Sequence, residues 1–405
     1  MPPSATPNHF LSKLRALAMP YWSSEERWSA RGLLAVVIGL NLFQVYLAVL
    51  LNQWNNAFYN ALQELDQAAF LHQLFRFCWL AALFILSGGY SFYLNQLLQI
   101  RWRRWMTEHL VGRYLDAKVY YRLQLGEVRT DNPDQRISED IPLFVQRSLE
   151  LSLGLLNAAV TLFSFLFILW TLSGPLELAL GRFDVAIPGY MVWVAILYAL
   201  FGTWLTHRIG RPLVGLYFQQ QRFEADMRFS LVRVREQAEG IALYGGEPIE
   251  HRTLSDRLGR VVDNFRRIIR NRKNLTFFTV GYAQIATIFP IVVASPRFFA
   301  KEIQLGGLMQ IASAFGQVHD SLSYVVQAYP EIANWRAVVD RLTSFVDAIA
   351  AVEARVAAES DAVDRVAGDR IVLDAVRLRL PDLPASARAR CCARSRASGP
   401  ISPAA

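Results

Sequence analysis

Apolar residues along this chain gather into six long stretches, and the loops between them carry most of the charge. The stretches are Leu33–Leu51, Phe77–Leu98, Leu151–Leu172, Ile187–Leu205, Leu275–Ala294 and Gly306–Ala328. Each approaches or exceeds the roughly 20 residues that a helix needs to cross about 30 Å of hydrocarbon. Because unpaired backbone amides cost several kcal/mol in lipid, the pattern predicts an all-α membrane protein with six transmembrane helices packed as a bundle. One such stretch alone could be a buried helix of a soluble protein.

The loops differ in positive charge, and this difference predicts the orientation. Cations flank the first, second, fourth and fifth stretches: Lys13, Arg15, Arg27, Arg31, Arg101, Arg103, Arg104, Arg208, Arg211, Arg266, Arg267, Arg270, Arg272 and Lys273. The loops Asn52–Arg76, Ser173–Ala186 and Ser295–Leu305 hold few cations. Since Lys and Arg stay on the cytoplasmic side, both termini are expected in the cytoplasm. Most of the net charge of +8 is then explained by the cations kept on the cytoplasmic side. No nucleic-acid partner is expected, because the arginines form no aromatic-interleaved stripe.

The ends of the chain add little chemistry. Residues 1–32 form an N-terminal segment without a cleavable signal peptide, because the first apolar run is late and long. An amphipathic elbow helix in the inner membrane interface is predicted there, ending at Pro20; a disordered tail is the alternative. Its apolar face is Phe10, Leu11, Leu14, Leu17 and Ala18. The cysteines Cys78, Cys391 and Cys392 have no metal-ligand spacing and support neither a disulfide framework nor a metal site.

The two long basic loops have the apolar spacing of helices that continue out of the membrane. The spacing predicts one helix over Ile100–Arg129, a break at Asn132-Pro133, and a restart at Asp134. It predicts two further helices, Leu213–Arg235 and His251–Arg272, separated by the glycines and proline of Tyr244–Pro248. We therefore expect long cytoplasmic helical extensions that act as levers capped by short transverse segments. A solvated linker is the simpler alternative.

Five ordered motifs carry a family resemblance: Leu51–Gln63 (LNQWNNAFYNALQ), Leu94–Trp105 (LNQLLQIRWRRW), Asp131–Asp140 (DNPDQRISED), Glu236–Glu247 (EQAEGIALYGGE) and Phe298–Gln310 (FFAKEIQLGGLMQ). They resemble the bacterial ABC transporters for vitamin B12, bleomycin and antimicrobial peptides. Their fused permease–ATPase relatives and, more distantly, the peroxisomal acyl-CoA half-transporters share the pattern. The resemblance runs from about Tyr21 to Val346, and Asn52 to Tyr59 within it could line a cavity mouth or form an interfacial aromatic belt.

The resemblance implies a six-span transmembrane domain of the ABC exporter type (type 1 exporter, type IV) over residues 33–350. It also implies a homodimer in the bacterial inner membrane that works with two ABC ATPase domains, so that ATP and Mg are cofactors of those domains only. Two segments would contact the ATPase: Asn132, Pro133, Asp134, Gln135 and Arg136, then Glu236, Glu239, Tyr244, Gly245, Gly246 and Glu247. An ordinary helix-start turn and a plain interhelical loop are the respective alternatives.

The C-terminal residues begin an ATPase domain without completing it. A linker over 351–368 precedes a strand-like segment, 369–380, that resembles the opening strand of an ABC ATPase domain. Residues 381–405 are rich in Ala, Arg, Ser and Pro. No Gly-x-x-x-x-Gly-Lys-Ser/Thr sequence occurs, so no catalytic or cofactor-binding residue is assigned and ATP hydrolysis by these residues alone is not expected. We hypothesise a truncated or frameshifted gene product whose native frame is lost near Leu383.

Three functions are compatible with the sequence. The first is the membrane-spanning subunit of an ABC transporter that moves a solute such as a peptide or corrinoid. The second is an ATPase-free, proton-driven peptide transporter, for which His319 and Asp320 are the titratable candidates at membrane depth. That pair could instead make a polar contact within the bundle or face water. The third is a non-transporting membrane scaffold. The solute and the direction of transport stay open.

Overall fold

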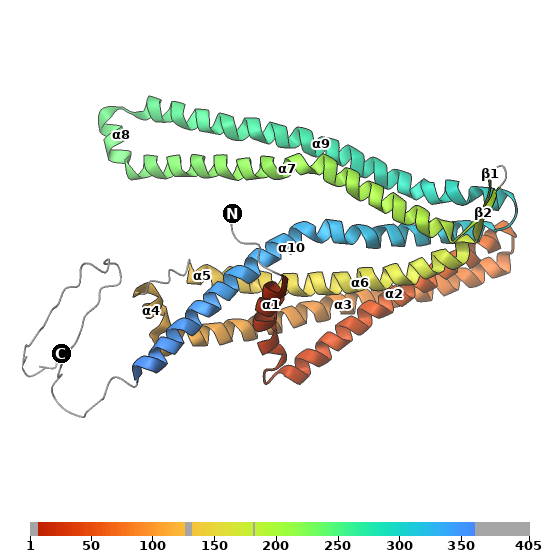
Figure 1. Ribbon diagram of the computed structural model, residues 1–405, viewed down its shortest axis with the longest axis horizontal. Coiled ribbons are helices and arrows are strands. Elements are labelled where there is room, and N and C mark those ends of the chain that lie inside the picture. Colours follow the sequence, from red (N-terminus) through yellow and green to blue (C-terminus); the bar gives the residue numbers. More distant parts are fainter. Residues whose placement is uncertain (1–6, 126–131, 181–182, 361–405) are drawn as a thin grey trace, which may run out of the picture. The chain divides into compact units, whose positions relative to one another are not determined.

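The computed structural model describes residues 7–125, 132–180 and 183–360, and these are almost entirely helical (Figure 1). In chain order the elements are α1 (Pro7–Trp22), α2 (Arg27–Gln63), α3 (Gln67–Leu115), the short turn η1 (Asp116–Lys118), α4 (Val119–Leu125), α5 (Pro133–Gln135), the short turn η2 (Arg136–Asp140), α6 (Ile141–Ser173), β1 (Pro175–Leu180), β2 (Phe183–Pro188), α7 (Tyr190–Glu236), α8 (Ala238–Tyr244), α9 (Glu247–Phe299) and α10 (Leu305–Ser360).

Two compact units divide the chain, and the long helices α2, α3, α6 and α10 contribute to both. Of the described residues, unit 1 comprises 7–40, 89–125, 132–153 and 329–360. Its core joins Leu17 and Tyr21 of α1 to Leu98 and Trp102 of α3, with Phe144 of α6. The ring of Tyr21 stacks on that of Trp102, with centroids 5.7 Å apart. Four of the five residues of the predicted apolar face of α1 therefore pack in this core, whereas Leu11 is exposed.

Unit 2 comprises residues 41–88 and 154–328. Its core is an aromatic and aliphatic cluster that includes Phe165 and Leu169 of α6, Met191 of α7, and Ile311 and Phe315 of α10. The helices α7 and α9 make extensive contacts along their length, and both belong wholly to this unit. They run side by side in opposite directions, and α8 joins them at one end (Figure 1).

Five helical segments are long and apolar enough to cross a membrane: Arg27–Gln63, Gln67–Leu123, Pro133–Ser173, Tyr190–Glu236 and Glu247–Phe299. They contain the first, second, third and fifth expected stretches and most of the fourth. The sixth stretch lies in α10, which does not reach the same apolarity because it carries Gln310, Gln317, His319 and Asp320. The helices α3 and α9 have 49 and 53 residues. At about 1.5 Å per residue they extend roughly 74 and 80 Å, more than twice the roughly 30 Å of hydrocarbon.

Several boundaries differ from the sequence prediction. The loop before the fourth stretch forms an antiparallel hairpin in which Pro175 pairs with Pro188, so the described part is not all-α and Ile187 belongs to β2. The helix expected over Ile100–Arg129 ends at Leu115, because Ala117 and Lys118 take positive φ. The chain then turns so that Val119 and Leu123 pack on Phe345. These long-range contacts have no local sequence signal.

Two prolines and the linker also differ from expectation. The helix α1 continues through Pro20 to Trp22, although proline cannot donate a backbone hydrogen bond there. Pro248 lies in the first turn of α9, where proline is tolerated, so it starts a helix instead of only breaking one. The linker predicted from residue 351 is helical up to Ser360. The strand predicted over 369–380 and the tail at 381–405 lie outside the described residues.

Candidate functional site

The segment Glu236–Glu247, called the tip segment below, connects α7 to α9 through the short helix α8. The helix α7 ends where Gln237 takes φ −107° and ψ 20°, a break that the sequence does not signal. Gly245 ends α8 with φ +63°, a left-handed conformation that glycine adopts at low cost. The backbone N–H of Gly246 then donates to the carbonyl of Ile241 at 2.9 Å. This is a regular helix stop, so the tip segment is an ordered transverse helix.

The tip segment presents its side chains to the surroundings. Tyr244 is 91 % exposed, and Leu243 and Ile249 beside it are also exposed. Glu236, Glu239 and Glu247 are exposed as well, and among the residues that the structure describes none of their carboxylates has a cation partner. Just inside the tip, Arg233 of α7 lies 3.7 Å from Glu250 of α9. The end of this helical hairpin therefore exposes both apolar side chains and carboxylates without a cation partner among the described residues.

The segment Asn132–Arg136, called the turn segment below, leads into α6 in unit 1. Asn132 is the N-cap of α5 with φ +44° and ψ +73°, and Pro133 follows in the first turn. The side-chain amide of Asn132 donates a long hydrogen bond of 3.4 Å to Gln135 Oε1. Asp134 lies in the same first turn, where a carboxylate is favoured by the helix dipole. The predicted restart of the helix here is confirmed to within one residue.

A buried carboxylate anchors the turn segment. Asp140 has a side chain that is only 5 % exposed, and Arg136 contacts it from one turn earlier. Arg341 of α10 donates to both carboxylate oxygens of Asp140, from Nη2 to Oδ1 at 2.6 Å and from Nε to Oδ2 at 2.9 Å. Burial would raise the pKa of Asp140, but the hydrogen bonds from Arg341 and Arg136 outweigh it and lower the pKa. The sequence spacing of Arg136 and Asp140 predicts their ion pair, whereas nothing in the sequence predicts the pairing of Asp140 with Arg341.

A second ion pair in unit 1 ties α3 to α10. Arg113 donates two hydrogen bonds to the Glu353 carboxylate, from Nη2 to Oε2 at 2.6 Å and from Nε to Oε1 at 2.9 Å. The hydrogen bond from Arg113 lowers the pKa of Glu353. Together with the Asp140–Arg341 pair, this contact fixes α10 to the helices on either side of the turn segment. Sequence reasoning missed both partners on α10, because each pairs across more than 200 residues.

The structure separates the environments of His319 and Asp320, although their side chains touch at 3.2 Å. The His319 side chain is 14 % exposed, whereas that of Asp320 is 79 % exposed. The imidazole lies against the rings of Tyr198 and Tyr282, with centroids 5.7 and 5.4 Å away. These two tyrosines stack at 4.4 Å, and each hydroxyl donates to the other's backbone carbonyl. Nε2 of His319 has no hydrogen-bond partner among the described residues.

An amide network joins the motifs Leu51–Gln63 and Phe298–Gln310. Asn52 and Gln310 exchange hydrogen bonds, from Asn52 Nδ2 to the Gln310 carbonyl at 3.1 Å and from Gln310 Nε2 to Asn52 Oδ1 at 3.0 Å. Asn56 donates to Gln310 Oε1 at 2.6 Å, and Asn60 accepts from the backbone of Gly306 at 2.8 Å. A Cβ on Gly306 would collide with the Asn56 carbonyl. These asparagines therefore hold α2 to the start of α10 in unit 2.

Comparison with known proteins gives the family. The family described as ABC transporter transmembrane region 2 matches residues 14–299, which is more than half of the chain. The chain belongs to this family. It is therefore a multi-pass membrane protein of the ABC transporter transmembrane class, and the resemblance drawn from the five motifs is confirmed.

Relatives of this ABC transporter membrane domain occur in plants, bacteria and animals. This chain is 38 % identical over 340 residues to ABC transporter D family member 2, chloroplastic, of Arabidopsis thaliana, and the match covers 83 % of this chain and 45 % of the relative. It is 35 % identical over 337 residues to the inner membrane ABC transporter ATP-binding protein YddA of Escherichia coli, covering 83 % and 60 %. It is 27 % identical over 290 residues to the human lysosomal cobalamin transporter ABCD4, covering 71 % and 45 %. The chain thus spans about half the length of these curated relatives.

A solved structure supports the fold. The chain matches a bacterial Atm1-family ABC exporter with ATP bound at a TM-score of 0.54 and 16 % identity. The match covers 78 % of this chain and 53 % of that one. At this identity the likeness concerns the fold alone. It agrees with the long antiparallel helices and the five apolar spans described above.

Proposed function

We propose that this chain is the membrane-spanning part of a homodimeric ABC transporter in the bacterial inner membrane, with both termini in the cytoplasm. Transport is driven by an ABC ATPase domain that the described residues do not include. One observation carries the proposal: α8 is an ordered transverse helix with exposed Tyr244, at the end of the α7–α9 hairpin of an ABC transmembrane domain. Such a helix offers a docking surface that a moving ATPase domain could push.

The proposal includes α10 as a sixth span, despite its polar residues. Polar groups are tolerated at membrane depth when protein atoms satisfy them. Gln310, the first of these residues, is buried and paired with Asn52 and Asn56, so it does not face lipid. A sixth crossing also returns the chain to the cytoplasmic side, where α10 continues to Ser360 toward an ATPase domain.

The two candidate coupling segments have complementary roles in this proposal. The tip segment supplies exposed apolar and acidic side chains that an ATPase surface can bind. The turn segment is tied through Asp140 to Arg341, so a displacement of the turn passes directly to α10. We take corrinoids as the first solutes to test, because the human relative is named a cobalamin transporter. Peptides come next, because the motifs resemble those of transporters for antimicrobial peptides.

The test is solute uptake into inverted membrane vesicles that contain the full chain with its ATPase domain. Uptake of radiolabelled cobalamin or peptide that requires ATP and exceeds that of vesicles lacking the chain supports the proposal. Binding of ATP without any effect of the chain on uptake or on ATP hydrolysis would refute it.

A proton-driven transporter is the second candidate, and one observation favours it. His319 is mostly covered by Tyr198 and Tyr282, and its Nε2 is buried and unpartnered among the described residues, as we would expect of a proton-carrying group at membrane depth. Uptake driven by an imposed pH gradient without ATP, and abolished by His319→Gln, would favour this candidate over the first.

A further inference from the structure

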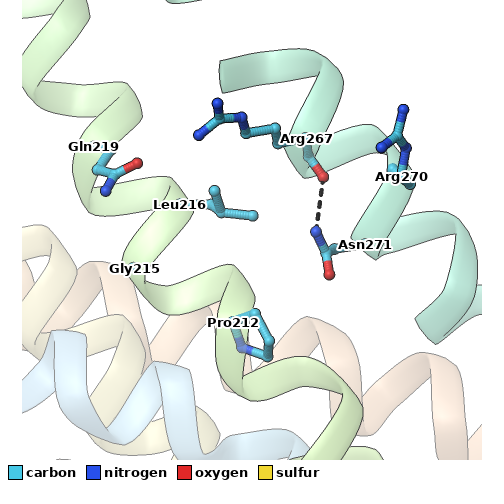
Figure 2. A pocket seen from close by; sticks show the side chains of 7 residues that line it. All are labelled: Pro212, Gly215, Leu216, Gln219, Arg267, Arg270 and Asn271. Carbon is cyan, nitrogen blue, oxygen red and sulfur yellow. Dashed lines mark hydrogen bonds between the residues drawn. The ribbon is translucent and has the colours of Figure 1, made fainter. Parts of the chain in front are cut away.

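A cleft of about 350 Å³ opens between α7 and α9 within unit 2. The helix α7 contributes Pro212, Gly215 and Leu216, and α9 contributes Arg267 and Arg270 (Figure 2). Arg267 extends from α9 toward α7, and Gln219 and Asn271 add amide groups to the rim (Figure 2). One wall is therefore apolar and the other carries two arginines, of which Arg267 faces α7 and Arg270 is turned to the other side of α9 (Figure 2).

Close helix contacts bound the cleft at both ends. Toward the apolar span, Gly210 lies against Leu275, whose side chain is 3.8 Å from the position of a Cβ on Gly210. Toward the tip, the buried Asn264 donates to the Leu216 carbonyl at 3.0 Å and to Gln220 Oε1 at 2.9 Å. Between these contacts, Gly215 lacks a side chain and nothing lies within 4 Å of where its Cβ would be. The helices are held together on either side of the gap, so the opening is built into the hairpin.

The charge around the cleft is uniformly positive. No Asp or Glu occurs in 208–222 of α7 or in 264–275 of α9, whereas these segments contain Arg208, Arg211, Arg222, Arg266, Arg267, Arg270, Arg272 and Lys273. Among the described residues, the guanidinium groups of Arg267 and Arg270 have no acceptor. Two unpaired guanidiniums over an apolar wall suit an anion with an attached apolar part, because guanidinium binds phosphate oxygens in pairs.

The level of the cleft matches lipid headgroups, on the orientation given in the proposed function. Asn271 lies four residues before the fifth apolar stretch and Pro212 seven residues after the fourth. At about 1.5 Å per residue these positions are roughly 6 and 10 Å outside the hydrocarbon. The polar headgroup layer is about 5–8 Å thick on each side. Arg270 and Arg267 lie five and eight residues before the fifth stretch, roughly 8 and 12 Å outside the hydrocarbon at about 1.5 Å per residue. Arg270 is therefore at the level of the headgroup phosphates, and the long side chain of Arg267 extends back toward them.

We propose that this cleft binds the phosphate of an anionic phospholipid from the cytoplasmic leaflet. Arg267 binds the phosphate oxygens, and Arg270 joins it by turning its side chain toward the cleft. Asn271 and Gln219 lie at the polar rim, and the acyl chain passes Pro212, the wall residue nearest the hydrocarbon. Basic pockets between transmembrane helices on this side bind anionic headgroups in the same way. Inorganic phosphate offers the same chemistry without the apolar part, so the test has to separate the two.

The test measures binding of short-chain phosphatidylglycerol to the full chain in neutral detergent by native mass spectrometry. Arg267→Gln/Arg270→Gln is expected to weaken binding about tenfold or more, the factor that one charged hydrogen bond contributes. The matched control Arg252→Gln/Arg260→Gln removes the same charge from exposed positions of α9 and should change binding less than about twofold. Gly215→Leu keeps every charge but fills the cleft, and it should also abolish binding.

Equal losses in both double variants would overturn the site, because surface charge alone would then explain binding. Unchanged binding in Gly215→Leu would overturn the role of the cleft. Displacement of the lipid by an equal concentration of inorganic phosphate would overturn the lipid as ligand. The assay contains neither ATP nor solute, so a failure of the transport proposal leaves its result intact, and a failure here leaves transport untouched.

Discussion

The turn segment and the tip segment differ in what holds their charged groups. Asp140, which follows the turn, is buried and gripped by Arg136 and Arg341. The three carboxylates of the tip, by contrast, are exposed and have no cation partner among the described residues. Buried ion pairs are costly to break, whereas exposed charges contribute little to stability. The comparison therefore separates a segment that is fixed within its own unit from one whose side chains are free for a partner.

The largest difference is expected in stability. Asp140→Ala leaves two guanidiniums without their carboxylate, one of them mostly buried, so unfolding should become easier by about 3 kcal/mol. The loss of stability is not larger because Arg341 is half-exposed, so water can solvate its guanidinium. Glu239→Ala at the tip should change stability by less than about 0.5 kcal/mol. Denaturant unfolding of the two variants in detergent compares them directly, and similar losses would remove the distinction between the segments.

The second difference is expected in coupling. Tyr244→Ala removes an exposed aromatic ring that no core residue covers, so stability should stay within about 0.5 kcal/mol of the parent. If the ring anchors an ATPase domain, ATP-dependent uptake in vesicles should fall about tenfold, because aromatic anchors dominate interfaces. Phe229→Ala removes another exposed ring from α7, away from the tip, and serves as the control. An equal effect in both variants would contradict a specific role for the tip.

A third prediction concerns the backbone of the tip. Gly245→Ala forces a side chain into the left-handed region and should destabilise α8 locally by about 1 kcal/mol. Gly240→Ala lies inside α8 with nothing within 4 Å of its Cβ position, so it should stabilise the helix by about 0.5–1 kcal/mol. Hydrogen exchange of residues 238–244 should therefore become faster in the first variant and slower in the second. The same sign in both would show that α8 is not ordered as described.

The smallest effect is a dependence on pH. The pKa of Asp140 is lowered in the folded protein, so its contribution is fully present above the unfolded pKa of about 3.9 and is lost as pH falls through the folded value. The stability gap between the parent and Asp140→Asn should stay constant from pH 7 to about 5 and shrink below about 4. Glu239→Gln should show no such change. Thermal unfolding across this range measures both, and a gap that widens in acid would reverse the sign of the argument.

Much of the helical framework follows from the sequence, because apolar length and flanking arginines are local signals. The stop at Gly245 and the start at Pro133 follow in the same way from glycine and proline chemistry. The η1 kink does not, since it arises from packing of Val119 on Phe345 far along the chain. Nor do the partners of Asp140 and Asn52, because Arg341 and Gln310 are more than 200 residues away. The position of Asp140 just before α6 and that of Asn52 on α2 can be predicted, but their contacts with α10 cannot.

The most direct test of the account asks what the tip segment touches in the cell. A photo-crosslinkable phenylalanine analogue replaces Tyr244 in the full chain, and adducts formed in living cells are identified by mass spectrometry. Replacement of Phe229 by the same analogue is the control. We expect position 244, and not 229, to crosslink to a polypeptide segment containing an ABC nucleotide-binding sequence. Adducts at 244 only with lipid, or only with proteins that lack a nucleotide-binding sequence, would contradict it.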